Sequence, residues 1–129
     1  MKKITITITM ILIGLASYSQ NLIGDSFRDV KKAMNDNGYK LEEGYTDDKI
    51  YYLLASDKSS FKGYYFTDAN ICNSYVVCHY GYTYGETETV LNNAKYYKNS
   101  NGDFISGVYI ARIKYLPESK EWYVIITYK

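Results

Sequence analysis

The sequence predicts an α+β fold in which two helices pack on one face of an antiparallel sheet, in the order α-β-β-β-β-α-β-β. Two stretches carry apolar residues at helical spacing, whereas most of the remaining chain consists of short strand-like segments joined by polar loops. The chain has 129 residues, which is enough for one domain and not for two. Short loops between successive strands favour antiparallel pairing as a meander.

The first 19 residues are typical of a secretory signal peptide. Lys2 and Lys3 supply the positive start, Ile4–Ala16 supplies the apolar segment, and small residues precede a cut ahead of Gln20. No cysteine lies directly after the apolar segment, so a bacterial lipoprotein anchor is not expected. We therefore expect an exported protein, periplasmic or secreted.

Residues 20–129 are expected to form a single compact α+β domain. The sequence contains no internal repeat or low-complexity tract, and no later apolar run long enough to cross a membrane. Loss of two signal lysines changes the balance from 15 basic and 14 acidic residues to 13 and 14, which gives a net charge of −1. This balanced charge argues against nucleic acid or an anionic membrane as a partner.

The first helix is expected to begin after Ser26, whose side chain can accept hydrogen bonds from the free backbone N–H groups. Phe27, Val30 and Met34 form an apolar stripe at helical spacing, and the charged residues lie mainly off that stripe. Gly38 follows an asparagine and supplies the left-handed stop.

Four strands follow this helix. Their expected positions are Tyr39–Tyr45, Lys49–Ala55, Phe61–Thr67 and a central strand within Ile71–Gly85. The central stretch holds both cysteines, the single histidine and three alternating tyrosines.

Residues of equal parity share one face of a strand. One face of the central strand would carry Cys72, Ser74, Val76, Cys78, Tyr80, Tyr82 and Tyr84. Gly81 leaves two alternatives open. A bulge at this glycine would turn the tyrosines into a surface patch, whereas a regular pleat would make them extend the core towards the end of the sheet.

The second helix is expected over Glu86–Tyr97. Its apolar face would comprise Val90, Leu91, Ala94 and Tyr97. Lys98–Asp103 is expected as a loop, Phe104–Leu116 as one long strand and Glu121–Tyr128 as the last strand. Pro117, the only proline, lies in the turn between these two strands.

Cys72 and Cys78 are not expected to form a disulfide with each other. Six residues of strand span roughly 20 Å, whereas the Cα atoms of a bridged pair lie within about 7 Å. We expect two reduced, partly buried thiols, and pairing between molecules remains an alternative.

No catalytic, metal or cofactor site is predicted. Cys78 and His79 are neighbours on a strand and point to opposite faces, so they cannot readily form a nucleophile–base pair. The two cysteines and the histidine lack the paired spacing of a zinc site. Acidic residues near loops and a helix start leave one alternative, a small envelope hydrolase. These residues are Glu42, Glu43, Asp47, Asp48, Glu86 and Glu88.

Tyrosine is the unusual component of the composition. One of the 17 tyrosines lies in the signal, which leaves 16 in the remaining chain. Buried hydroxyl groups need partners, so many of these tyrosines are expected at the surface. Rigid aromatic side chains with polar tips are enriched in binding surfaces. The candidate binding residues are Tyr80, Tyr82, Tyr84, Tyr64 and Tyr65. The expected function is a non-catalytic binding module, with a protein or a glycan as the partner.

The segment that leads into the first helix resembles two families. Gly24, Ser26, Val30 and Gly38 match the entry of BamE/SmpA envelope domains and of the repeat unit of β-lactamase-inhibitor proteins. The second half is similar to small secreted bacterial proteins of unknown function. The lipid-anchoring cysteine of the BamE pattern is missing, which argues against a role in outer-membrane assembly. The resemblance implies a protein-contacting sheet and no catalytic residues.

Overall fold

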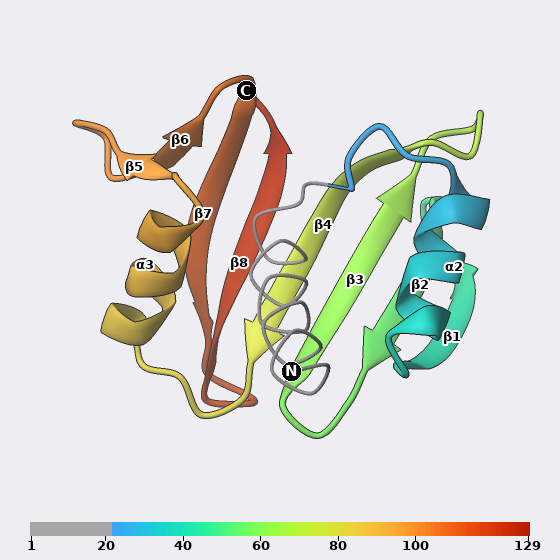
Figure 1. Cartoon of the computed structure of the whole chain (residues 1–129), viewed down its shortest axis with the longest axis horizontal. Helices are drawn as coiled ribbons and strands as arrows, with labels where there is room; N and C mark the ends of the chain where they lie inside the picture. The colour runs from blue at the N-terminus through green and yellow to red at the C-terminus, as the bar shows by residue number, and fades with distance from the viewer. Residues whose placement is uncertain (1–21) are drawn as a thin grey trace, which may run out of the picture.

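The computed structural model describes residues 22–129, so the expected export signal lies outside the described residues (Figure 1). The elements are α2 (Phe27–Asp36), β1 (Lys40–Tyr45), β2 (Tyr51–Ser56), β3 (Ser60–Phe66), β4 (Cys72–His79), α3 (Tyr84–Asn93), β5 (Tyr97–Lys98), β6 (Phe104–Ser106), β7 (Tyr109–Leu116) and β8 (Glu121–Tyr128).

The eight strands form one antiparallel sheet in the order β1-β2-β3-β4-β8-β7-β6-β5, which confirms the α+β class. The second half has four strands, where the sequence predicted two. The expected long strand over 104–116 is a hairpin, because Gly107 turns the chain with a φ of 60° between β6 and β7. The expected loop over 98–103 begins with Lys98, which pairs with Phe104 as part of β5.

Helix α2 begins and packs as the sequence predicted. Ser26 is the N-cap and accepts a hydrogen bond from the Asp29 backbone N–H at 3.2 Å. Val30 and Met34 are buried against the sheet, where the Tyr64 hydroxyl donates to the Met34 sulfur at 3.6 Å. The Phe27 ring contacts the ring of Phe66 at 5.0 Å between centroids.

Helix α3 begins at Tyr84, two residues before the expected start, and ends at Asn93. Thr83 and Glu86 form a reciprocal capping box at its N-terminus. The expected apolar face was wrong at its end, because the helix stops early and Lys95 turns the chain with a φ of 68°. Tyr96 therefore enters the core, and Tyr97 lies on β5 with 61% of its surface exposed.

The chain contains a structural repeat that the sequence analysis missed. A helix followed by a four-stranded meander occurs twice, and β4 and β8 join the two copies at the centre of the sheet. Equivalent residues recur at one constant spacing. The pairs are Gly24 and Gly81 (both with positive φ), Ser26 and Thr83 (both N-caps), Met34 and Leu91 (both buried), and Tyr39 and Tyr96. Two of these four pairs are identical, the glycines and the tyrosines, and the other two share a role in the fold.

Strand β4 contains a bulge that changes the expected faces. Tyr65 pairs with Ser74, whereas Phe66 pairs with Cys72, so Asn73 is an extra residue in β4. The core side consequently changes from even to odd positions at this point. Cys72 is in the core, and Tyr75 takes the next core position in place of the expected Ser74.

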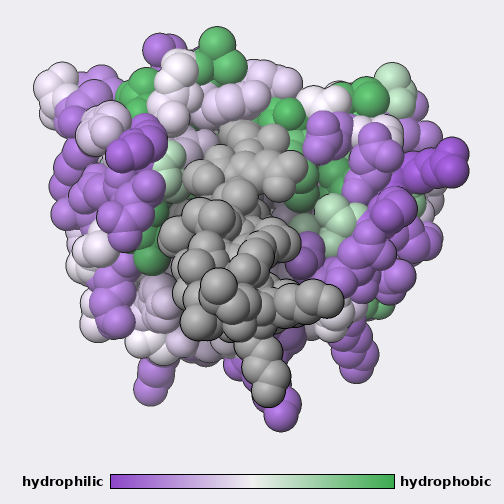
Figure 2. All heavy atoms as spheres, in the orientation of Figure 1, coloured by the Kyte–Doolittle hydropathy of each residue, from purple (hydrophilic) through white to green (hydrophobic). Residues whose placement is uncertain are grey.

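The two faces of the sheet differ in what covers them. Both helices lie on the face turned towards the viewer in Figure 1, with α2 near β1 and β2 and α3 beside β7. Hydrophilic side chains cover the outer surfaces of both helices (Figure 2). No helix of residues 22–129 packs on the opposite face, which we call the open face.

Candidate functional site

The adjacent tyrosines of β3 lie on opposite faces of the sheet. Tyr64 is only 2% exposed and stacks on Tyr75 with 5.4 Å between ring centroids. Burial raises the pKa of the Tyr64 hydroxyl, which disfavours its ionised form. Tyr65 points to the open face and is half-buried. Of this pair, Tyr65 is therefore the residue available for contact with another molecule.

The other three predicted tyrosines do not form a ladder, because β4 ends at His79. Tyr80 is 43% exposed just beyond the strand, and burial of its hydroxyl raises its pKa. Tyr82 stacks on the His79 ring at 4.8 Å. Tyr84 is the first residue of α3 and meets the Trp122 ring edge-on at 5.3 Å. The structure thus places these tyrosines in three separate environments.

Gly81 takes neither of the two roles left open by the sequence. It has a φ of 80° in the turn after β4, where glycine avoids the steric cost of a side chain. Its backbone N–H donates to the Glu121 carboxylate at 3.0 Å, which ties this turn to the start of β8. The bulge of β4 lies at the other end of the strand.

The open face is built from three rows of side chains that cross the strands, defined by the register of the sheet. The central row comprises Glu42, Leu54, Gly63, Val76, Ile125 and Arg112. The tyrosine row comprises Gly44, Tyr52, Tyr65, Ser74, Thr127 and Ile110. The phenylalanine row comprises Lys40, Ser56, Phe61 and Cys78, followed by Tyr123 and Lys114 on β8 and β7.

Two glycines let the aromatic side chains of this face lie close to the backbone. A Cβ atom at Gly44 would lie 2.8 Å from the Tyr52 hydroxyl oxygen, because that side chain extends over the glycine. A Cβ atom at Gly63 would lie 3.4 Å from a Leu54 methyl group and 3.7 Å from the Tyr65 hydroxyl oxygen. These contacts hold the side chains down on the sheet and give a low, mostly apolar surface.

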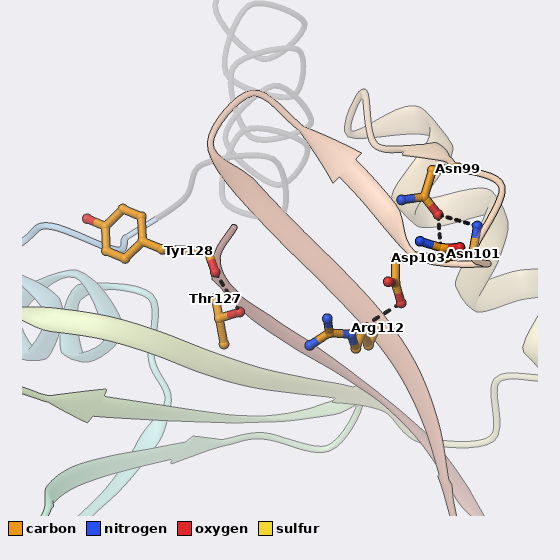
Figure 3. Close-up of polar contacts among 6 residues, drawn as sticks. All are labelled: Asn99, Asn101, Asp103, Arg112, Thr127 and Tyr128. Atoms are coloured by element: carbon orange, nitrogen blue, oxygen red, sulfur yellow. Dashed lines mark hydrogen bonds and ion pairs between the residues drawn. The ribbon is translucent and has the colours of Figure 1, made fainter.

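Charged side chains lie at the margin of the open face. Lys40 and Glu42 lie on β1, and Lys114 lies on β7; all three are exposed. Arg112 on β7 donates from Nε to the Asp103 carboxylate at 3.2 Å (Figure 3). The Arg112 side chain is half-exposed, so this pair orients the arginine more than it stabilises the fold.

A hydrogen-bonded loop holds Asp103 in place. The Asn99 side-chain oxygen accepts from the backbone N–H groups of Asn101 and Asp103, both at 3.0 Å (Figure 3). The Asn99 backbone N–H donates to the Asp103 carbonyl oxygen at 2.8 Å. In the same view, Thr127 lies on neighbouring β8, and its hydroxyl donates to the Tyr128 carbonyl oxygen at 3.2 Å.

Two hollows adjoin the open face. One of about 170 Å³ lies over β1, β2 and β3 and is lined by Lys40, Glu42, Leu54, Ser56 and Phe61, together with Leu41. The other, of about 530 Å³, lies at the loop end of β3 and β4, where Tyr65 and Ser74 meet Asp48 and Asp68. An uneven apolar surface with a few polar groups beside it is suited to binding the surface of another protein.

The two thiols lie on opposite faces because of the bulge in β4. Cys72 is in the core under the helices, whereas Cys78 pairs with Phe61 on the open face. Burial raises the pKa of each thiol to about 11, so both are protonated at neutral pH. For His79, burial and the nearby Lys62 charge lower the pKa, which favours the neutral ring. Protonated thiols are weak nucleophiles.

Several of the acidic residues considered for hydrolysis have structural partners. The pKa of Glu43 is lowered by hydrogen bonds from Lys31 and Tyr51, and Glu88 pairs with Lys98 at 3.5 Å. Glu86 belongs to the capping box of α3. Within residues 22–129, no group of three or more histidine, cysteine or acidic side chains is placed to hold a metal ion.

The open face includes residues that the sequence analysis did not select, namely Leu54, Phe61, Val76, Tyr123 and Ile125. A signal for them is present in the sequence. Strands such as Tyr51–Ser56 are apolar at both odd and even positions, a pattern typical of strands covered on both faces. Only one face of this strand is covered by a helix.

Comparison with known protein families, with curated proteins and with solved structures found no match for this chain. Among the described residues, no helix has the length and apolar character needed to span a membrane.

Proposed function

We propose that this protein is an exported, non-catalytic binding module whose open face contacts its partner. The observation that carries the proposal is the continuous apolar and aromatic surface on strands β2, β3, β4 and β8. Its half-buried side chains include Tyr52, Leu54, Tyr65, Val76 and Ile125. Broad apolar surfaces with polar margins are characteristic of protein–protein contacts.

The breadth of this surface favours a protein over a glycan as the partner. The surface extends across several strands and is low, whereas small ligands are generally held in enclosed pockets. The expected export signal supports a location in the periplasm or outside the cell. Three of the acidic residues considered for the hydrolase alternative already have structural roles, because Glu43 and Glu88 form ion pairs and Glu86 caps α3.

The proposal is tested by partner capture with the tagged chain from Gln20 to Lys129. We expect the double variant Tyr65→Ser/Tyr123→Ser to lose a partner that the wild type retains, because it removes two aromatic contacts from the open face. Capture is measured from envelope extract and culture medium, with mass spectrometry of the retained proteins. An untagged copy of the chain itself counts as a partner.

Tyr45→Ser is the matched control, because Tyr45 is 71% exposed on the other face of the sheet. This variant should retain the partner. A double variant that keeps its circular dichroism spectrum and still retains every partner would contradict the proposed site.

A further inference from the structure

We propose that a second copy of this chain occupies the open face, so that two sheets pack face to face around a twofold axis. This inference rests on the proposed function, because it names the partner of the same surface. In such an isologous contact each copy presents the same residues, so the face must be complementary to itself.

The distribution of charge on the open face is that of an interface. In the three rows defined above, strands β2, β3, β4 and β8 carry no charged side chain. The charges of these rows lie on the flanking strands β1 and β7. A charge-free centre inside a charged margin is the arrangement that protein–protein interfaces share.

The face is complementary to itself in side-chain size. A twofold axis parallel to the strands, placed between β3 and β4, superposes β3 of one copy on β4 of the other and β2 on β8. Leu54 then lies opposite Ile125, whereas elsewhere large residues of one copy lie opposite small residues of its partner in the same row. These pairs are Tyr65 with Ser74, Phe61 with Cys78, Val76 with Gly63, and Tyr52 with Thr127.

The same axis brings charged margins together. It places Glu42 of one copy opposite Arg112 of the other at both ends of the central row. Arg112 is half-exposed beside Asp103, so it can approach a second carboxylate. Lys40 and Lys114 also lie opposite each other, at a solvated edge where salt screens their repulsion.

The area of the face is sufficient for a stable dimer. Six strands spaced about 4.8 Å apart, each contributing about six residues at about 3.4 Å per residue, give a flat area of roughly 600 Å² per copy. Two copies would bury about 1,200 Å², which is the lower limit for stable protein interfaces. Side chains that protrude from the sheet make the real contact area larger than this flat estimate.

The test is the mass of the chain in solution, measured by analytical ultracentrifugation over a range of concentrations. The sample for this measurement is the full chain, expressed, exported and processed by a bacterial host. Val76→Asp inserts a charge at the centre of the proposed interface, and Val108→Asp inserts the same charge at a hairpin tip that is 59% exposed. We expect dimers for the wild type and for Val108→Asp. For Val76→Asp we expect the Kd of the dimer to be at least about 30-fold higher.

Glu42→Arg is a second variant, and it keeps the fold intact because Glu42 is exposed on an edge strand. It should weaken the dimer by placing like charges opposite each other. Dimers formed equally by the wild type, folded Val76→Asp and Glu42→Arg would overturn the inference. So would a wild type that is monomeric at every concentration. If that monomer still loses a partner through Tyr65→Ser/Tyr123→Ser, the proposed function stands with a different protein on the open face.

Discussion

At the scale of single residues, each pair of adjacent tyrosines places one side chain on each face of the sheet. Tyr51 lies on the helix side and donates its hydroxyl to Glu43 at 2.9 Å, whereas Tyr52 lies over Gly44 on the open face. Tyr64 and Tyr65 are divided in the same way. The chain thus uses tyrosine both to complete its core and to supply its proposed contact surface.

The raised pKa of the thiols gives a prediction at this scale. At pH 8 the thiolate fraction of a thiol with a pKa of about 11 is on the order of 10²-fold smaller than that of an ordinary cysteine. We expect slow modification of Cys72 and Cys78 in the folded chain, measured with a chromogenic disulfide reagent. Below the raised pKa, the rate should rise about tenfold for each pH unit.

The control for thiol reactivity is the chain unfolded in guanidinium chloride, where both cysteines should react rapidly. The sign for stability is also defined. Because the folded state favours the protonated thiols, their contribution is complete below the ordinary thiol pKa and declines as the pH rises above it. Rapid modification of both folded thiols at pH 7 would contradict this account.

At the scale of elements, the two helices begin in the same way and pack differently. Ser26 and Thr83 each accept a hydrogen bond from the backbone three residues later, and Thr83 also has a returning partner in Glu86. Helix α2 buries Val30 and Met34, whereas α3 buries Leu91 and the polar Thr87. The N-terminal cap therefore contributes a larger share of the stability of α3 than of α2.

We expect Thr83→Ala to lower the free energy of unfolding by about 1 kcal/mol, because it removes the side-chain half of the capping box. Thr83→Ser is the matched control, since a serine hydroxyl can accept the same hydrogen bond from Glu86. Urea denaturation followed by circular dichroism measures both variants. Equal stability of the alanine and serine variants would show that the cap is unimportant.

At the scale of the whole molecule, the pairing of β4 with β8 joins two similar halves into one sheet. Tyr75 pairs with Ile126 and Val77 with Val124, and all four are buried on the helix side. The core cluster includes residues of both helices and of strands from both halves. Such a shared core should make the two halves unfold together.

This cooperativity is tested by Ile126→Ala at the junction of the halves. Ile126 is only 1% exposed, so its truncation should cost roughly 2–5 kcal/mol. Trp122, the only tryptophan, reports on the second half through its fluorescence, whereas circular dichroism reports on the whole chain. The two signals should give one urea midpoint in the wild type and one lower midpoint in the variant.

Separate midpoints for tryptophan fluorescence and circular dichroism would mean that the halves unfold independently. Val108→Asp is a suitable control for Ile126→Ala, because Val108 is exposed at a hairpin tip and should leave the midpoint nearly unchanged.

Local sequence patterns predict the fold class, the first helix and most of the sheet, because helical spacing, strand alternation and turn residues act over a few neighbours. Ser26 as an N-cap and the last strand, Glu121–Tyr128, follow from such local signals. Pairing between strands determines which side chains lie on each face of the sheet. The extra residue Asn73 exchanges the two sides of β4. This bulge is defined by the neighbouring strand, where Tyr65 pairs with Ser74 and Phe66 pairs with Cys72.

The candidate site depended still more on tertiary structure. Tyr65 was selected from the sequence, but Val76 and Ile125 join it on one face only through pairing between strands that are distant in the chain. Alternation identifies which residues share a face of one strand, and it does not identify which face a helix will cover. The positions of α2 and α3 on the same side leave the other side open, and that choice is made by packing across the whole sheet.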